Sequence, residues 1–197
     1  MTILYKLTDE HDRTHGGCQW GEGVEHVTDG HGNLCGPGFT HWYTDPLLAV
    51  LLNPIHANFK NPHLWEGEGD VAKTDRGLKV GCTRGKTLKR LPLPEISLTQ
   101  RVVFGILCAK TVYTDTAWNK WANDWLSGVD RTRAAAAAAA DAAYAADAAA
   151  YAASHAASHA ASYAASYAAS HAASYAASHS VYLDLIAVAH QALAVEP

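Results

Sequence analysis

The sequence predicts an α+β fold, with a compact N-terminal domain containing a β-meander and two to three helices, and a long alanine-rich C-terminal helical arm. Two observations lead to this prediction. Three short strand-like segments follow one another between residues 64 and 94, separated by expected turns at residues 75–77 and at Gly85. After Gly128 the chain has no glycine or proline before its last residue, and more than half of residues 134–179 are alanine. We therefore expect a domain over residues 1–127 and an arm over residues 128–197.

The first 38 residues predict one strand and a long irregular segment. Residues 2–8 alternate between apolar and polar side chains, which is typical of a half-buried strand. A polar turn then leads into residues 16–38, which are rich in glycine and have Trp20 and Val24 as apolar anchors. A segment of this length without regular structure either wraps the core or lines a site.

Capping residues and apolar spacing predict the helices of the domain. Asp45 is the expected N-cap of an almost wholly apolar helix that begins at Pro46 and ends at Pro54. A second, amphipathic helix is expected from Leu98 to about Tyr113. Asp115 is expected to cap a third helix. Three tryptophans at spacings of three and four share one face of this helix, which we expect to be buried in a core: Trp118, Trp121 and Trp125.

From residue 151 onward the arm repeats a tetrad of two alanines, one serine and one ring, either tyrosine or histidine. Alanine is the strongest helix former, so the tract favours a helix. A continuous helix over residues 129–195 would be roughly 100 Å long, and most of it could not pack on its own domain unless it folded back. Four residues advance a helix by about 400°, so the ring stripe turns slowly in the right-handed sense. Two alternatives remain open: a repeat without function, and a silk-like β-stack.

We expect the ring positions of the arm to join copies of the chain. Alanine and serine between the rings leave no bulk that would hold two helices apart. Residues 181–195 carry large aliphatic side chains at helical spacing, enough to dock on the domain or on another copy. The expected oligomer interface consists of eight ring positions and two aliphatic residues: Tyr151, His155, His159, Tyr163, Tyr167, His171, Tyr175, His179, Leu185 and Ile186.

The charge distribution argues against nucleic acid and membrane partners. All 15 lysines and arginines lie at or before Arg133, where 15 of the 19 acidic residues balance them. No basic stripe exists that could release counterions from a phosphate backbone. The N-terminus lacks the apolar stretch of a secretory signal, and the alanine-serine tract is too polar for a membrane span.

Histidine and cysteine in the N-terminal loops suggest a ligand or metal site, because zinc prefers thiolate and imidazole ligands. The candidate residues are His15, Cys18, Cys35 and His41. His15 and Cys18 lie three positions apart, but no second close pair of the kind found in zinc sites follows. No metal and no cofactor is therefore predicted.

A catalytic arrangement would place Cys35, His41, His56 and Glu66 around one pocket. Cysteine beside histidine can form an activated nucleophile, and Glu66 or its neighbour Glu68 could act as a general base. Their separations in the sequence are compatible with any fold and specific to none. We therefore predict no catalytic residue.

Several linear runs resemble a small domain of unknown function found in bacteriophage and bacterial genomes. The runs are LYKLTDE, QWGEGVEH, LCGPGFTHWYTDPLLAVLLNPIHANFKNPHLWEGEGD, LKVGC and QRVVFGILCA. The resemblance covers roughly residues 3–127, and alanine-rich repeats often follow the domain in that family. It implies an intracellular or phage-encoded origin and no particular activity.

These observations favour a non-enzymatic structural protein whose helical arm mediates self-association into an oligomer or filament. The alternative is a small phage-encoded enzyme or ligand-binding protein with its site in the N-terminal loops. The expected partner is a second copy of the chain. The expected location is the cytoplasm of a bacterial host, with extracellular assembly as an open alternative.

Overall fold

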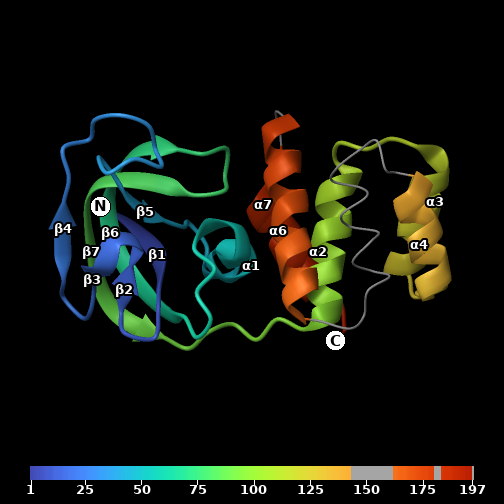
Figure 1. The fold of residues 1–197 in the computed structure, drawn as a ribbon, viewed down its shortest axis with the longest axis horizontal. Coiled ribbons are helices and arrows are strands. Elements are labelled where there is room, and N and C mark those ends of the chain that lie inside the picture. The colour runs from blue at the N-terminus through green and yellow to red at the C-terminus, as the bar shows by residue number, and fades with distance from the viewer. Residues whose placement is uncertain (143–161, 180–182, 197) are drawn as a thin grey trace. The chain divides into compact units, whose positions relative to one another are not determined.

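The computed structural model describes residues 1–142, 162–179 and 183–196 of the chain (Figure 1). It contains both a β-sheet and helices, which confirms the mixed character of the predicted fold. The chain divides into two compact units, Met1–Glu95 and Ile96–Pro197. This division comes earlier than the expected boundary at residue 127, because the helix that follows residue 96 packs against the C-terminal helices.

The N-terminal unit is built on an antiparallel sheet. Its strands lie in the order β1 (Thr2–Thr8), β6 (His63–Thr74), β7 (Val80–Leu91) and β4 (Glu25–Val27), and β5 (Thr40–Trp42) also pairs with β7. A separate two-stranded ladder joins β2 (Arg13–Thr14) to β3 (Cys18–Gln19), with the short 3-10 helix His15–Gly17 between them. The alternating N-terminal segment is therefore a strand, as predicted.

The expected three-stranded meander is a hairpin of two long strands, β6 and β7. The sequence suggested a turn at Gly85, but this glycine lies inside β7. A Cβ atom at Gly85 would lie 2.6 Å from Nε1 of Trp42, so the missing side chain makes room for the indole rather than for a turn. The actual turn of the hairpin contains Arg76 and Gly77, both with positive φ.

One face of the sheet encloses an apolar core formed by Leu4, Trp20, Trp42, Val80 and Cys82. Helix α1 (Pro46–His56) packs against β1. Its start is as predicted, since the Asp45 carboxylate accepts a hydrogen bond from Leu47 N at 2.8 Å. Its predicted end is wrong, because Pro54 lies inside the helix, which continues to His56.

The second unit contains five described helices: α2 (Leu98–Lys110), α3 (Thr116–Leu126), α4 (Arg133–Ala142), α6 (Ser162–His179) and α7 (Leu185–Leu193). Helix α2 begins with a capping box in which Ser97 and Gln100 satisfy each other's backbone N–H groups. Asp115 caps α3, as predicted, by accepting from Trp118 N at 2.8 Å. The tryptophan stripe of α3 is buried, so these side chains do form core.

The alanine-rich tail is not one helix up to residue 195. Asp184 has an extended backbone and begins α7 afresh by accepting hydrogen bonds from Ile186 N and Ala187 N. Both α6 and α7 pack against α2, so this part of the tail folds back onto its own unit (Figure 1). Helices α4 and α6 lie on either side of a segment, residues 143–161, that is outside the described residues.

Gln100 links the start of α2 to the end of α7. Its Oε1 accepts from Ser97 N at 2.9 Å, while its Nε2 donates to the carbonyls of Leu193 and Val195, both at 3.1 Å. The last carbonyls of a helix lack partners within the helix, so this amide supplies donors that α7 needs. Among the described helices, none is both long and apolar enough to cross a bilayer.

Candidate functional site

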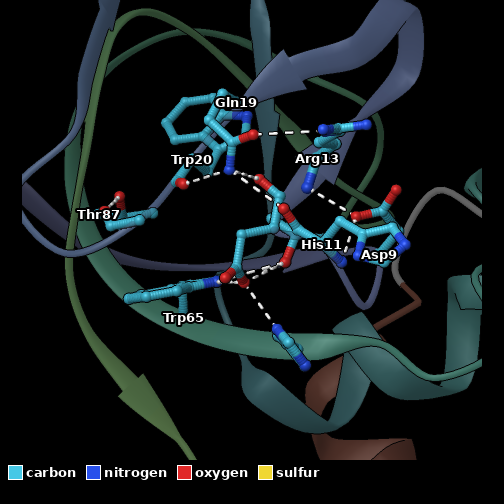
Figure 2. Close-up of polar contacts among 11 residues, drawn as sticks. Asp9, His11, Arg13, Gln19, Trp20, Trp65 and Thr87 are labelled. Atoms are coloured by element: carbon cyan, nitrogen blue, oxygen red, sulfur yellow. Dashed lines mark hydrogen bonds and ion pairs between the residues drawn. The ribbon is translucent and has the colours of Figure 1, made fainter.

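A connected group of polar side chains forms around the turn after β1 in the N-terminal unit (Figure 2). Asp9 holds this turn, because its carboxylate accepts from the backbone N–H groups of His11 at 2.9 Å and Arg13 at 2.7 Å. The turn places Asp12 at φ 61°, a left-handed conformation that aspartate adopts more readily than most residues. The side chain of Asp12 is thereby fixed at the end of the sheet.

Gln19, on β3, holds the same turn from the other side. Its Nε2 lies within hydrogen-bond distance of three carbonyl oxygens, those of His11 at 3.1 Å, Asp12 at 3.2 Å and Trp20 at 3.0 Å. Figure 2 shows the Gln19 amide between Trp20 and the turn. The backbone N–H of Trp20 also donates to Asp12 O at 2.7 Å, so the position of Asp12 is determined by two segments.

The Asp12 carboxylate lies within hydrogen-bond distance of three side chains on β1 and β6. Its Oδ1 lies 2.7 Å from Nδ1 of His63, 3.2 Å from Nε1 of Trp65 and 3.3 Å from Oγ1 of Thr8. His63 and Trp65 are two residues apart on β6 and share one face, and Thr8 is the ladder partner of His63. We assign the proton to Nδ1 of His63, since it faces a carboxylate. Among the described residues, no hydrogen bond to Nε2 of His63 is found.

His63 lies beside a surface groove at the open end of the β6–β7 hairpin. The groove has a volume of about 400 Å³ and is lined by Pro62, His63, Leu64, Arg90, Leu91, Pro92 and Leu93. Its size lies within the range of small-ligand sites. It therefore combines an oriented imidazole, a guanidinium and an apolar wall.

A second unusual group is the buried side chain of Lys6, only 4% exposed, on the inward face of β1. Its Nζ lies 4.1 Å from the ring centroid of Trp20 and 4.7 Å from that of Trp42, and it donates to His41 O at 2.8 Å. Burial lowers the pKa of Lys6 from 10.5 to about 7, and the neighbouring thiols of Cys18 and Cys82 oppose this shift. The cage of aromatic faces is thus occupied by the protein's own lysine.

The four residues proposed for a ligand or metal site each have their own surroundings. His15 is exposed, Cys18 Sγ lies 3.6 Å from Nε2 of His26, and Cys35 Sγ lies 3.2 Å from Nζ of Lys79. His41 contacts the carbonyl of Leu34, and burial lowers the pKa of its imidazole. Within the described ranges, no three histidine, cysteine or acidic side chains are grouped so that they could hold a metal ion.

The other residues considered for catalysis are also engaged elsewhere. His56 Nδ1 lies 2.9 Å from the hydroxyl of Tyr43, and burial lowers the pKa of this imidazole to about 4. Glu66 forms an ion pair with Lys89 at 3.0 Å. No hydrogen bond joins either residue to Cys35 or His41 in the described part of the chain, so the nucleophile arrangement receives no support.

The proposed interface residues of the arm fall into three groups. Tyr151, His155 and His159 lie outside the described residues, and Tyr163 and Tyr167 lie in α6 with side chains that the structure does not describe. His171 and Tyr175 are half-buried and His179 is exposed, and the rings of Tyr175 and His179 stack with centroids 4.0 Å apart. Of the two aliphatic residues, Leu185 is buried and Ile186 is half-buried.

Sequence reasoning missed the group around Asp12 and the buried Lys6. Lys6 had a visible signal, because it occupies an inward position of the alternating strand between Leu4 and Thr8. His63 and Trp65 alternate in the same way on β6, but nothing in the sequence connects them to Asp12, which lies 51 positions before His63 and 53 before Trp65.

No protein-family model, curated protein or solved structure matches this chain. The similarity to a phage domain of unknown function stays a prediction.

Proposed function

We propose that this protein is a non-enzymatic assembly protein, in which the alanine-rich tail joins copies of the chain into an oligomer or filament. The observation that supports this proposal is a difference in burial between the positions of the tetrad repeat. In the last part of α6 the two alanines of each tetrad are buried, and the serine and the ring are half-buried or exposed.

The buried positions form one continuous face of α6, made of Ala172, Ala173, Ala176 and Ala177. Residues four apart lie one above the other on a helix, so the alanine pairs of successive tetrads stack along one side. Helix α6 packs against α2, and methyl side chains permit a close approach of the two backbones. The alanines thereby serve contacts within the chain.

We assign the contacts with another copy to the rings of the tetrads. Tyr175 and His179 already stack on each other with an interplanar angle of 16°, which presents a flat aromatic surface on the helix. An aromatic pair contributes about 0.5–1.5 kcal/mol beyond the burial of its area. A single pair would be too weak to join two chains, but the sequence repeats the ring every four residues, so many weak contacts would act together.

Sedimentation velocity on ring variants tests this proposal. We expect the double variant Tyr175→Ser, His179→Ser to sediment more slowly than the natural protein at the same concentration, because two ring contacts are lost. Ser178→Ala serves as the matched control, since Ser178 is an exposed residue between the two rings. The proposal is wrong if the double variant and the control assemble equally well.

The alternative from the sequence, a ligand site formed by His15, Cys18, Cys35 and His41, gains no support from their separate surroundings. The proposed partner remains a second copy of the chain, and the proposed location remains the cytoplasm of a bacterial host.

A further inference from the structure

We infer that the groove at the open end of the β6–β7 hairpin binds a small organic carboxylate, with the anion held by His63 and Arg90 and the apolar body resting on Leu91, Pro92 and Leu93. This inference is independent of assembly through the tail. It rests on the orientation of His63, the position of Arg90 and the composition of the groove wall.

His63 is oriented before any ligand arrives. Asp12 fixes the ring through Nδ1 at 2.7 Å, and Asp12 is itself held by Trp65 and Thr8. The backbone of Asp12 is fixed in turn by the contacts of Gln19 and Trp20. Such preorganisation reduces the ordering cost of binding. With a proton on each ring nitrogen, Nδ1–H donates to Asp12 and Nε2–H can donate to an anion.

Arg90 lies on the same face of the hairpin as His63. It is the ladder partner of Trp65, and cross-strand partners point to the same side of a sheet. Trp65 and His63 are two residues apart on β6, so the three side chains share one face. Arg90 is exposed and has no ion-pair partner among the described residues, whereas its neighbour Lys89 pairs with Glu66. The guanidinium is therefore available to a carboxylate, whose geometry it matches with two donors.

The remaining wall of the groove determines which anions fit. Pro62, Leu64, Leu91, Pro92 and Leu93 line it, and Leu93 is 40% exposed, so its side chain is accessible to a ligand. A free inorganic anion would make no use of this wall. A carboxylate attached to an apolar body would bury the apolar wall and accept hydrogen bonds from His63 and Arg90, so this class of ligand fits best.

Benzoate is a suitable probe, since it combines a carboxylate with a flat apolar ring. We would follow the ring protons of His63 by NMR in the full chain, at fixed pH, during titration with benzoate, benzyl alcohol or inorganic phosphate. Benzoate is expected to produce a saturable shift with a Kd of about 1 mM, as befits so small a ligand. Benzyl alcohol lacks the charge and phosphate lacks the apolar body, so both should bind at least about tenfold more weakly.

Two variants and a control locate the site. Arg90→Gln and Leu93→Ser, both at exposed positions, should weaken benzoate binding, the first by about tenfold. Arg76→Gln serves as the control, because Arg76 is an exposed arginine in the hairpin turn, at the other end of β7 from Arg90. The inference is overturned if benzoate gives no saturable shift, if benzyl alcohol or phosphate binds as tightly as benzoate, or if Arg76→Gln weakens binding as much as Arg90→Gln.

Discussion

Replacing the buried Lys6 by methionine should stabilise the N-terminal unit at pH 6. Methionine keeps an unbranched chain between the rings of Trp20 and Trp42 but carries no charge. The unfolded lysine has a pKa of 10.5 and the folded one a pKa of about 7. This difference corresponds to roughly 5 kcal/mol of unfolding free energy lost when the folded lysine is charged. Allowing about 1 kcal/mol for the hydrogen bond to His41 O, and a similar amount for packing, we expect a net gain of roughly 2–4 kcal/mol.

The gain should depend on pH in a definite direction. Between pH 7 and 10.5 the unfolded chain holds a proton on Lys6 that the folded chain has released, so the stability of the natural protein rises with pH in this window. Below about pH 7 the full cost is present. The advantage of Lys6→Met should therefore be largest at pH 6 and shrink by pH 9. The pKa of His56, lowered by burial to about 4, has no contribution from Lys6, so His56 cancels in the difference. The pKa of Cys82, about 11, is partly lowered by Lys6, so the thiol keeps its proton at pH 6 and pH 9 with or without that lysine and changes the difference little.

Urea unfolding of both proteins at pH 6 and pH 9 measures this difference. The amide NMR signals of β6 and β7 report the N-terminal unit separately from the tryptophans of α3. A methionine variant that is less stable than the natural protein at pH 6 would refute the reasoning. So would an advantage that is the same at both pH values, since Lys6 would then be charged in the folded protein throughout the window.

Two further predictions concern packing and capping. Gly85→Ala should cost roughly 1–3 kcal/mol, because the new Cβ would lie 2.6 Å from Trp42 Nε1; urea unfolding measured on the β7 amides checks this, and a neutral effect would show that Trp42 shifts freely. Gln100→Ala should loosen α7 by roughly 2 kcal/mol, since two carbonyls lose their donor, and hydrogen exchange of residues 185–193 would report it. Gln100→Glu should also loosen α7, because it keeps the acceptor for Ser97 N but removes the donors to Leu193 and Val195. Gln191→Ala, at an exposed position of α7, is the control. Equal hydrogen exchange in all three variants would contradict the assigned role of Gln100.

Local signals predicted the starts of α1, α2 and α3 and the first strand correctly. The caps Asp45 and Asp115 act on neighbouring backbone groups, so their effect can be read from a few adjacent residues. The tryptophan stripe of α3 was also predicted as core, because helical spacing alone places these side chains on one face.

Features that depend on distant contacts could not be predicted in this way. Gly85 looked like a turn residue, and only the indole of Trp42, which comes from another strand, explains why a glycine lies inside β7. The alanine tract looked like a free arm, because its burial depends on α2, about 70 residues earlier along the chain. Asp12 and His63 form a pair only because β1 and β6 are neighbours in the sheet.

Packing of the tail on α2 also changes how assembly should be tested. Removing residues 129–197 would uncover the face of α2 that α6 and α7 cover, so a truncated chain would expose apolar surface and is a poor control. The intact chain is the appropriate sample.

Sedimentation equilibrium of the full chain, from about 1 to about 100 µM, tests the central claim most directly, because mass action makes the assembled fraction rise with concentration. We expect an average mass that increases with concentration above the 21.0 kDa of a single chain. A mass of 21.0 kDa at every concentration would contradict it, and the rings of the tetrads would then have no role in joining copies.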